Sequence, residues 1–225
     1  MSAVALIRGD SREENISRAL SLLGDEINLK DRSCVLVKPN IVSHLHPGAS
    51  TSAMALKAVL EFLRGRYGGR IVVGEGTGFP AMEGYKKLGY IDIAKKYDAE
   101  LKDLSAGPWI EIDVYDRYLN PLRLHYSSLV AESDYRISLC LPKTHDALRV
   151  SLAIKNLAMA SLKAEIPGGR NSLSRSIQRC VYEKIPPWLK YARLVDSMKK
   201  FIVCRAGVND RVRMHQSYPS HNFNI

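Results

Sequence analysis

The chain has 225 residues, of which 46% are hydrophobic, and a formal net charge of +10. This length fits one large domain or two small ones, and the hydrophobic share is enough for a sizeable core. No apolar run approaches the roughly 18 residues of a membrane-spanning helix, and residues 1–8 lack the pattern of a signal peptide, so we expect neither.

Buried strands and amphipathic helices alternate along the chain. In order, the pattern predicts a strand at 3–7, a helix capped by Ser11, a strand at 34–37, a helix capped at 50–52, a strand at 71–73, helices at 82–88 and 91–96, a strand at 99–104, a hairpin of 110–114 with 122–125, a strand at 135–141, and helices at 147–163, 172–183 and 188–203. Such alternation implies right-handed crossovers between parallel strands.

We therefore expect an α/β fold: a mostly parallel, doubly wound sheet with flanking helices and a helical, basic C-terminal third. Residues 1–225 are predicted to form a single domain, with a helical basic subregion at 147–205. Residues 1–142 contain 18 Lys and Arg and 18 Asp and Glu, so the whole charge excess lies in 143–225. This excess has two interpretations: a surface that binds an anionic partner, or helical faces that are simply exposed to solvent. We favour the solvated faces, because a charge run alone is weak evidence for a partner.

The cysteines indicate neither a metal motif nor a disulfide framework. Cys34, Cys140, Cys180 and Cys204 show no C-x-x-C spacing, so the chain has no motif for zinc or an iron–sulfur cluster. Cys34 and Cys140 lie in apolar runs, where cysteine acts as a small buried hydrophobe. A reducing cytoplasm is the simplest compartment for such a chain.

Polar residues follow three of the predicted buried strands, at the point where each strand ends. They are Lys38 and Asn40 after 34–37, Glu75 after 71–73, and Lys143, Thr144 and His145 after 135–141. In open parallel sheets, ligands bind outside the carboxyl ends of the strands. We therefore expect these side chains to converge on one edge of the sheet.

Two lysines beside hydroxyls and free backbone N–H groups suit an anionic ligand. The predicted ligand-binding residues are Lys38, Asn40, Thr51, Gly74, Gly76, Thr144, Lys155, Asn156 and His215. The predicted catalytic residues are Lys143, as a point charge, and His145 and Glu75, as general acid or base. The cofactor stays open. One alternative is a divalent metal, for which Glu75 and His145 would be ligands together with His44, His46 or His215.

Each part of this constellation also has a structural alternative. A lysine at the end of a strand is usually solvated. Gly74, Gly76 and Gly78 spell G-x-G-x-G, which departs from the dinucleotide fingerprint and favours a tight turn. No Walker loop, G-x-S-x-G elbow or H-E-x-x-H motif occurs. The joint placement at three strand ends, rather than any single residue, is what favours a ligand site.

Six segments together resemble an uncharacterised family called domain of unknown function 362. They are residues 35–40, 73–76, 88–90, 141–145, 152–157 and 214–216. The resemblance implies a cytoplasmic α/β protein, no established reaction, and a site shared by Lys38, Asn40, Glu75, Lys143, His145, Lys155, Asn156 and His215. Some relatives carry a ferredoxin-like iron–sulfur module. Relatives usually continue beyond the position of Ile225, so either the chain is truncated or it lacks part of the sheet.

Three functions are compatible with these patterns. The leading hypothesis is an enzyme or enzyme-like domain that binds a small anionic molecule at the strand ends, with or without a metal. The second is an accessory protein of iron–sulfur or redox metabolism with an iron–sulfur protein as partner, which rests on family analogy alone. The third, nucleic-acid binding through the basic last third, ranks last because no binding motif occurs there.

Overall fold

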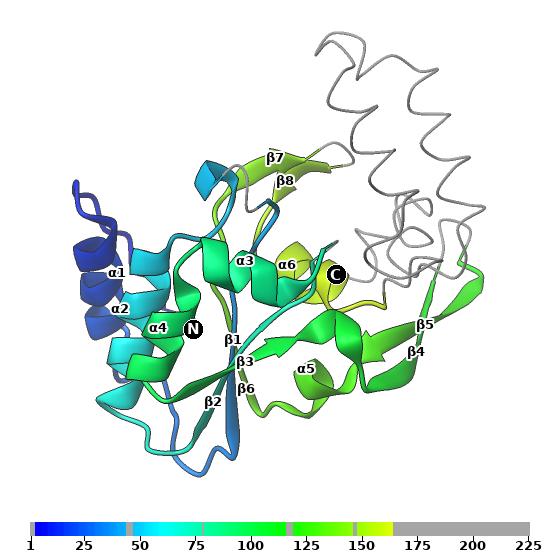
Figure 1. Cartoon of the computed structure of the whole chain (residues 1–225), viewed down its shortest axis with the longest axis horizontal. Helices are drawn as coiled ribbons and strands as arrows, with labels where there is room; N and C mark the ends of the chain where they lie inside the picture. Colours follow the sequence, from blue (N-terminus) through cyan, green and yellow to red (C-terminus); the bar gives the residue numbers. More distant parts are fainter. Residues whose placement is uncertain (1–2, 44–46, 78, 116–118, 146–147, 164–225) are drawn as a thin grey trace, which may run out of the picture.

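The computed structural model describes residues 3–43, 47–77, 79–115, 119–145 and 148–163 (Figure 1). In chain order, the elements are α1 (Arg12–Leu22), β1 (Cys34–Lys38), the 3-10 turn η1 (Pro47–Ala49), α2 (Ala53–Arg64), β2 (Arg70–Glu75), α3 (Ala81–Lys87), α4 (Tyr90–Lys96), β3 (Ala99–Asp103), the 3-10 turn η2 (Leu104–Ala106), β4 (Trp109–Tyr115), β5 (Pro121–Ser127), α5 (Ser128–Glu132), β6 (Tyr135–Ser138), β7 (Lys143–His145), β8 (Leu148–Ser151) and α6 (Ala153–Ala160).

Four parallel strands form the central sheet, in the order β3-β2-β1-β6. In the interior strand β1, Val35 is paired with Ile71 of β2 on one side and with Tyr135 of β6 on the other. All five residues of β1 are buried, as a continuous apolar run predicts for a strand covered on both faces. The chain passes from β1 through β2 to β3 and then places β6 on the opposite side of β1. The strand order therefore reverses between β1 and β6.

Alternating side chains of the sheet build two apolar layers, because successive residues of a strand point to opposite faces. On one face, Val35 belongs to a cluster with Leu56 of α2. On the other face, Leu36 belongs to a cluster with Leu104 and Val130. Figure 1 shows α1, α2 and α4 on one side of the sheet, and α5, α6 and the β4–β5 hairpin on the other. This arrangement confirms the predicted α/β class with helices flanking a parallel sheet.

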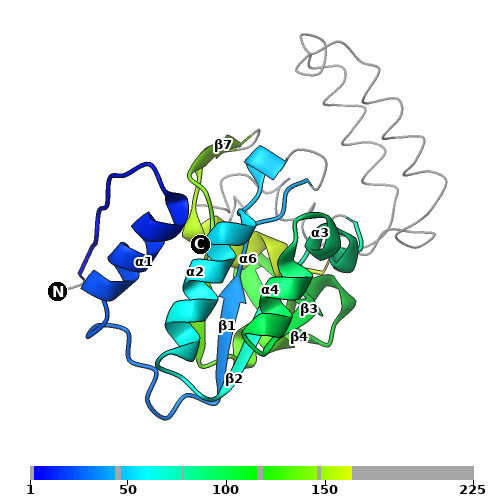
Figure 2. The same ribbon diagram turned by 60° about the vertical axis from the view of Figure 1, so that its left-hand side comes forward.

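The two N-terminal helices begin where the sequence predicts. The Ser11 hydroxyl accepts a hydrogen bond from Glu14 N at 3.3 Å and caps α1, and the Ser52 hydroxyl accepts one from Ala55 N at 3.2 Å and caps α2. Helix α1 has no buried residue and lies against α2, as Figure 2 shows. Helix α2 therefore carries the core contacts, and α1 adds an outer layer.

Two predicted elements are wrong. Residues 3–7 form no strand, and Val4 and Leu6 are 90% and 94% exposed, so their side chains have no described apolar layer to join. The helix predicted from residue 147 begins only at Ala153, because residues 148–151 form β8, which pairs antiparallel with β7. The predicted strand at 135–141 is also shorter and ends at Ser138. The helices predicted at 172–183 and 188–203, and so most of the basic subregion, lie outside the described residues.

Within the described part of the chain, no helix has both the length and the apolar character needed to cross a bilayer. Cys34, buried in β1, and Cys140 are free thiols there. Cys180 and Cys204 lie outside the described residues.

Candidate functional site

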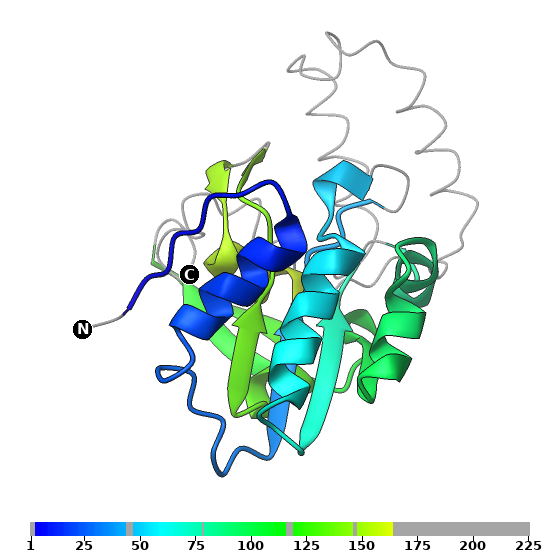
Figure 3. The same cartoon turned by 90° about the vertical axis from the view of Figure 1, so that its left-hand side faces the viewer.

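The carboxyl ends of β1 and β6 lie side by side where the strand order reverses. Open α/β sheets bind ligands at such a point, because the connections leave in opposite directions and open a crevice. Figure 3 shows the strand arrows of the sheet pointing to one end, which is therefore the carboxyl end of the strands. The β7–β8 hairpin lies at this same end in Figure 1. The two strand ends are joined directly, since Leu139 N donates a 2.8 Å hydrogen bond to Lys38 O.

A fully buried ion pair lies at the end of β1. Lys38 Nζ is 2.6 Å from Glu75 Oε1 at the end of β2 and also donates to Pro39 O at 3.2 Å. The Glu75 carboxylate accepts two further hydrogen bonds, from Ile41 N at 2.9 Å and Gly76 N at 2.8 Å. Both charges are therefore compensated by charge-assisted hydrogen bonds, which a buried pair requires. The pair fixes the start of the loop after β1.

Asn156 of α6 joins the same network with all four of its hydrogen-bonding positions. Its Nδ2 donates to Lys38 O at 3.1 Å and to Ser138 Oγ at 3.0 Å. Its Oδ1 accepts from Lys38 Nζ at 3.1 Å and from Asn40 Nδ2 at 3.2 Å. A buried amide satisfied in this way holds its helix in one orientation. Asn156 therefore docks α6 onto the ends of both β1 and β6.

Thr51 ties the loop after β1 to β6. Its buried hydroxyl accepts from Asn40 N at 3.0 Å and donates to Leu139 O at 2.7 Å. The Thr51 carbonyl in turn accepts a 2.6 Å hydrogen bond from the Tyr90 hydroxyl, whose pKa is raised chiefly by burial. The loop therefore has a fixed course above the sheet.

An open cleft lies above this buried layer, with a volume of about 510 Å³. The loop after β1, the segment after β6, the β7–β8 hairpin and α6 all contribute to it. We call it the lysine cleft, and its lining residues are Asn40, Val42, Gly48, Ala49, Leu141, Pro142, Lys143, Thr144, Ser151 and Lys155. These described lining residues include two lysines and no acidic side chain.

The two lysines differ in their hydrogen bonds. Lys143 Nζ donates to Asn40 Oδ1 and, at 3.1 Å, to Ala49 O. Lys155 Nζ has no hydrogen-bond partner among the described residues. Burial lowers the pKa of both ammonium groups, and burial together with the nearby charge of Lys143 lowers the pKa of Lys155 to about 8. A negative charge in the cleft would relieve the repulsion between them.

The structure divides the predicted site residues into groups. Asn40, Lys143, Thr144 and Lys155 line the cleft, whereas Lys38, Thr51, Glu75 and Asn156 form the buried layer beneath it. Gly74 is a core position, because a Cβ there would meet Leu104 Cδ2 at 2.9 Å. Gly76 contributes its backbone N–H to the carboxylate of Glu75. The side chain of His145 on β7, and the whole of His44, His46 and His215, lie outside the described part.

Two serines of the site were not predicted from the sequence. Ser151 lines the lysine cleft from β8, and Ser138 accepts a hydrogen bond from Asn156. The signal for β8 was present, because Leu148–Ser151 alternates apolar and polar residues with the period of a strand. Among the described residues, at this site or away from it, no group of three or more His, Cys, Asp or Glu side chains gathers that could hold a metal ion. The metal alternative, which uses undescribed histidines, stays a prediction.

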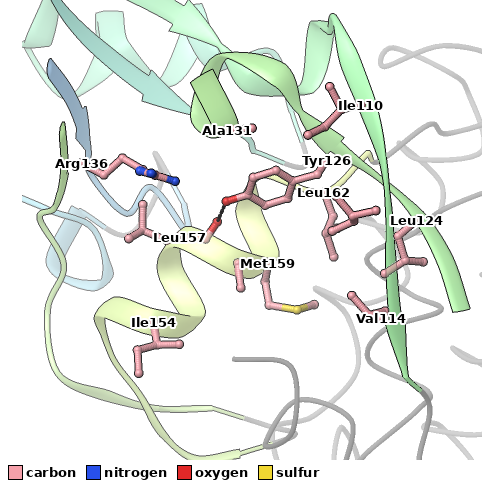
Figure 4. A pocket seen from close by; sticks show the side chains of 12 residues that line it. Ile110, Val114, Leu124, Tyr126, Ala131, Arg136, Ile154, Leu157, Met159 and Leu162 are labelled. Atoms are coloured by element: carbon pink, nitrogen blue, oxygen red, sulfur yellow. Dashed lines mark hydrogen bonds between the residues drawn. The ribbon is translucent and has the colours of Figure 1, made fainter. Parts of the chain in front are cut away.

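A second cavity of about 520 Å³ lies between the β4–β5 hairpin, α5, β6 and α6. Figure 4 shows its lining, which is apolar except for Arg136 and the Tyr126 hydroxyl, a donor to Leu157 O at 3.3 Å. Helix α6 contributes Ile154 and Leu157 to this cavity and Lys155 to the lysine cleft. The two cavities therefore differ in chemistry, and only the lysine cleft lies at the reversal of strand order.

Comparison with known proteins confirms the family resemblance found in the sequence. Residues 35–222 match a family model described as "Domain of unknown function (DUF362)". The chain belongs to this family. The DUF362 match begins within β1 and includes all the residues of the lysine cleft and of the buried layer, whereas α1 precedes it. No curated protein and no solved structure matches the chain.

Proposed function

We propose that the lysine cleft binds a small molecule bearing a carboxylate or phosphate, and that the protein is an enzyme-like domain acting on that molecule. One observation carries the proposal: Lys143 and Lys155 share a cleft at the reversal of strand order, and the residues described along its lining include no acidic side chain. Desolvated ammonium groups that repel one another are stabilised by a bound anion. The cleft is also of the size that small ligands occupy.

The residues of the cleft would contribute to binding in different ways. Lys143, tethered by Asn40 and Ala49 O, supplies a fixed positive charge. Lys155 supplies a second at pH 7, because its pKa of about 8 leaves most of its side chains protonated there. Thr144 and Ser151 add hydroxyl donors beside them. We assign Glu75 a positioning role in place of the predicted general acid or base, since its oxygens are taken up by Lys38 and two backbone N–H groups. His145 remains the candidate acid or base.

The test is calorimetric titration of the full chain with phosphate, pyrophosphate and citrate at pH 7. We expect Lys143→Gln and Lys155→Gln each to weaken binding by about tenfold or more, because a hydrogen bond to a charged group contributes about 1.5–3 kcal/mol. Lys95→Gln, at an exposed position of α4, is the matched control and should bind as the wild type does. Wild-type protein that binds none of the three anions would contradict the proposal, as would undiminished binding by both cleft variants.

The other two hypotheses have no support among the described residues. An accessory role in iron–sulfur metabolism still rests on the family resemblance alone. Nucleic-acid binding invokes the basic last third, most of which lies outside the described part. We therefore propose neither.

A further inference from the structure

We propose that Lys155 is a nucleophile that forms a Schiff base with the aldehyde or ketone group of a small anionic substrate, whose carboxylate or phosphate is bound by Lys143. The inference names the substrate class of the lysine cleft and rests on the proposed function. A Schiff-base lysine needs a fixed position, an unencumbered amine and a substantial neutral fraction. The lysine cleft supplies all three.

The position of Lys155 is fixed by its neighbour in α6. Asn156 is buried and hydrogen-bonded to Lys38, Asn40 and Ser138, so the helix backbone at this point is docked on two strand ends. Consecutive residues of an α-helix are about 100° apart around its axis. Lys155 therefore leaves the helix in a different direction from Asn156 and reaches the lysine cleft.

The two lysines have separate tasks because their contacts differ. Lys143 uses two of its three N–H donors on Asn40 Oδ1 and Ala49 O, which leaves one for a substrate anion. Lys155 Nζ has no acceptor among the described residues, and no carboxylate lines the described part of the cleft. No described acceptor or carboxylate therefore stabilises the protonated form of Lys155.

The electrostatic environment favours the neutral amine of Lys155. Burial, and then the charge of Lys143, lower the pKa of Lys155 to about 8. At pH 8 the Lys155 amine is therefore neutral in about half of the molecules. This neutral fraction is roughly a hundredfold larger than that of a lysine with the ordinary pKa of about 10.4. A lysine that is desolvated beside a second cation is activated as a nucleophile in this way.

The reaction balances without any redox partner. The lone pair of Lys155 Nζ attacks the carbonyl carbon, a C–N bond forms, and the carbonyl oxygen takes up the proton lost by nitrogen to give a carbinolamine. A second proton, from solvent, converts the hydroxyl into water. Water leaves as the C=N bond forms, and the product is a protonated imine on Lys155. Lys143 holds the anionic group of the substrate throughout.

Reductive trapping tests the inference. The full chain is incubated at pH 8 with cyanoborohydride and either pyruvate or glyceraldehyde 3-phosphate, and the modified lysine is located by peptide mass mapping. Acetone, in which a methyl group replaces the carboxylate of pyruvate, is the matched probe without charge. We expect one adduct per chain at Lys155, with a yield from pyruvate about tenfold above that from acetone because of the charge-assisted contact with Lys143.

Four variants decide the outcome. Lys155→Arg and Lys155→Gln should both remove the adduct, Lys143→Gln should reduce the pyruvate yield to that of acetone, and Lys95→Arg should leave it unchanged. Adducts spread over exposed lysines, a yield unaffected by both Lys155 variants, or no adduct with either anionic probe would overturn the inference. Pyrophosphate titration then separates the two proposals: if wild-type protein still binds pyrophosphate, only the nucleophilic role fails, and if it does not, both fail.

Discussion

Replacing Lys38 with methionine tests whether the buried layer beneath the lysine cleft depends on its ion pair. Methionine keeps most of the side-chain volume but removes the ammonium group. The Glu75 carboxylate would then keep its hydrogen bonds from Ile41 N and Gly76 N and lose its only described cationic partner, 2.6 Å away. Removing one partner of a buried ion pair typically costs about 3–5 kcal/mol, because the other charge stays buried without compensation.

The assay is urea unfolding of wild type and variant, followed by circular dichroism. Lys38→Met should lower the free energy of unfolding by about 3–5 kcal/mol. The double variant Lys38→Met/Glu75→Gln should lose less than the two single variants together, with a coupling energy of about 1–3 kcal/mol. Lys57→Met is the control, since Lys57 forms an ion pair of the same 2.6 Å length with Glu13 but both side chains are partly exposed. A solvent-exposed pair contributes little.

A loss of less than about 1 kcal/mol in Lys38→Met would refute this reasoning, because a pair worth so little behaves like one on the surface. Equal losses in Lys38→Met and Lys57→Met would refute it as well. Either result would mean that water reaches Glu75 and that the ion pair does not fix the floor of the lysine cleft.

Two further predictions concern positions outside the lysine cleft. Gly74→Ala should destabilise the protein by about 1–3 kcal/mol, because its Cβ would press against Leu104 in the core, whereas Gly68→Ala, with open space around it, should not; urea unfolding compares the two. Glu100 has its pKa lowered to about 2 by hydrogen bonds from Arg70, so it stabilises the fold above its ordinary pKa of about 4.5, and this contribution is lost as the pH falls through 2. The wild type should therefore be more stable than Glu100→Gln at pH 6 by a small, solvent-screened margin that vanishes near pH 2, and a margin that grows with acid would contradict the assignment.

Much of the sheet could be predicted because its signals are local. The apolar run Cys34–Val37 has no polar residue, and only a strand covered on both faces accommodates it in so short a length. The convergence of strand-end residues followed from the rule that parallel strands end on one edge. Lys38 and Glu75 do meet there at the ends of two strands, although 37 residues separate them in sequence, and Asn156 of α6 joins them.

What the sequence could not separate is the buried layer from the cleft above it. Lys38 and Lys143 both follow apolar runs that predict buried strands, and they have the same side chain, yet Lys38 is fully buried and Lys143 lines the cleft. The difference depends on which side chains the neighbouring strand and helix supply, and these are contacts between distant residues. The strand β8 was missed for a related reason: its pairing with β7 outweighs the helical pattern of residues 147–163.

The most direct test of the anion site is the ionisation of Lys155 itself. In protein labelled with ¹³C-lysine, the pH titration of the Cε resonances should show a lysine with a pKa of about 8, absent from Lys155→Arg, beside surface lysines near 10.4. Saturating pyrophosphate should raise that pKa, because a bound anion stabilises the charged form. A titration in which pyrophosphate leaves every lysine resonance and pKa unchanged would contradict an anion-binding role for the lysine cleft, and one in which every lysine ionises near 10.4 would contradict the nucleophilic role of Lys155.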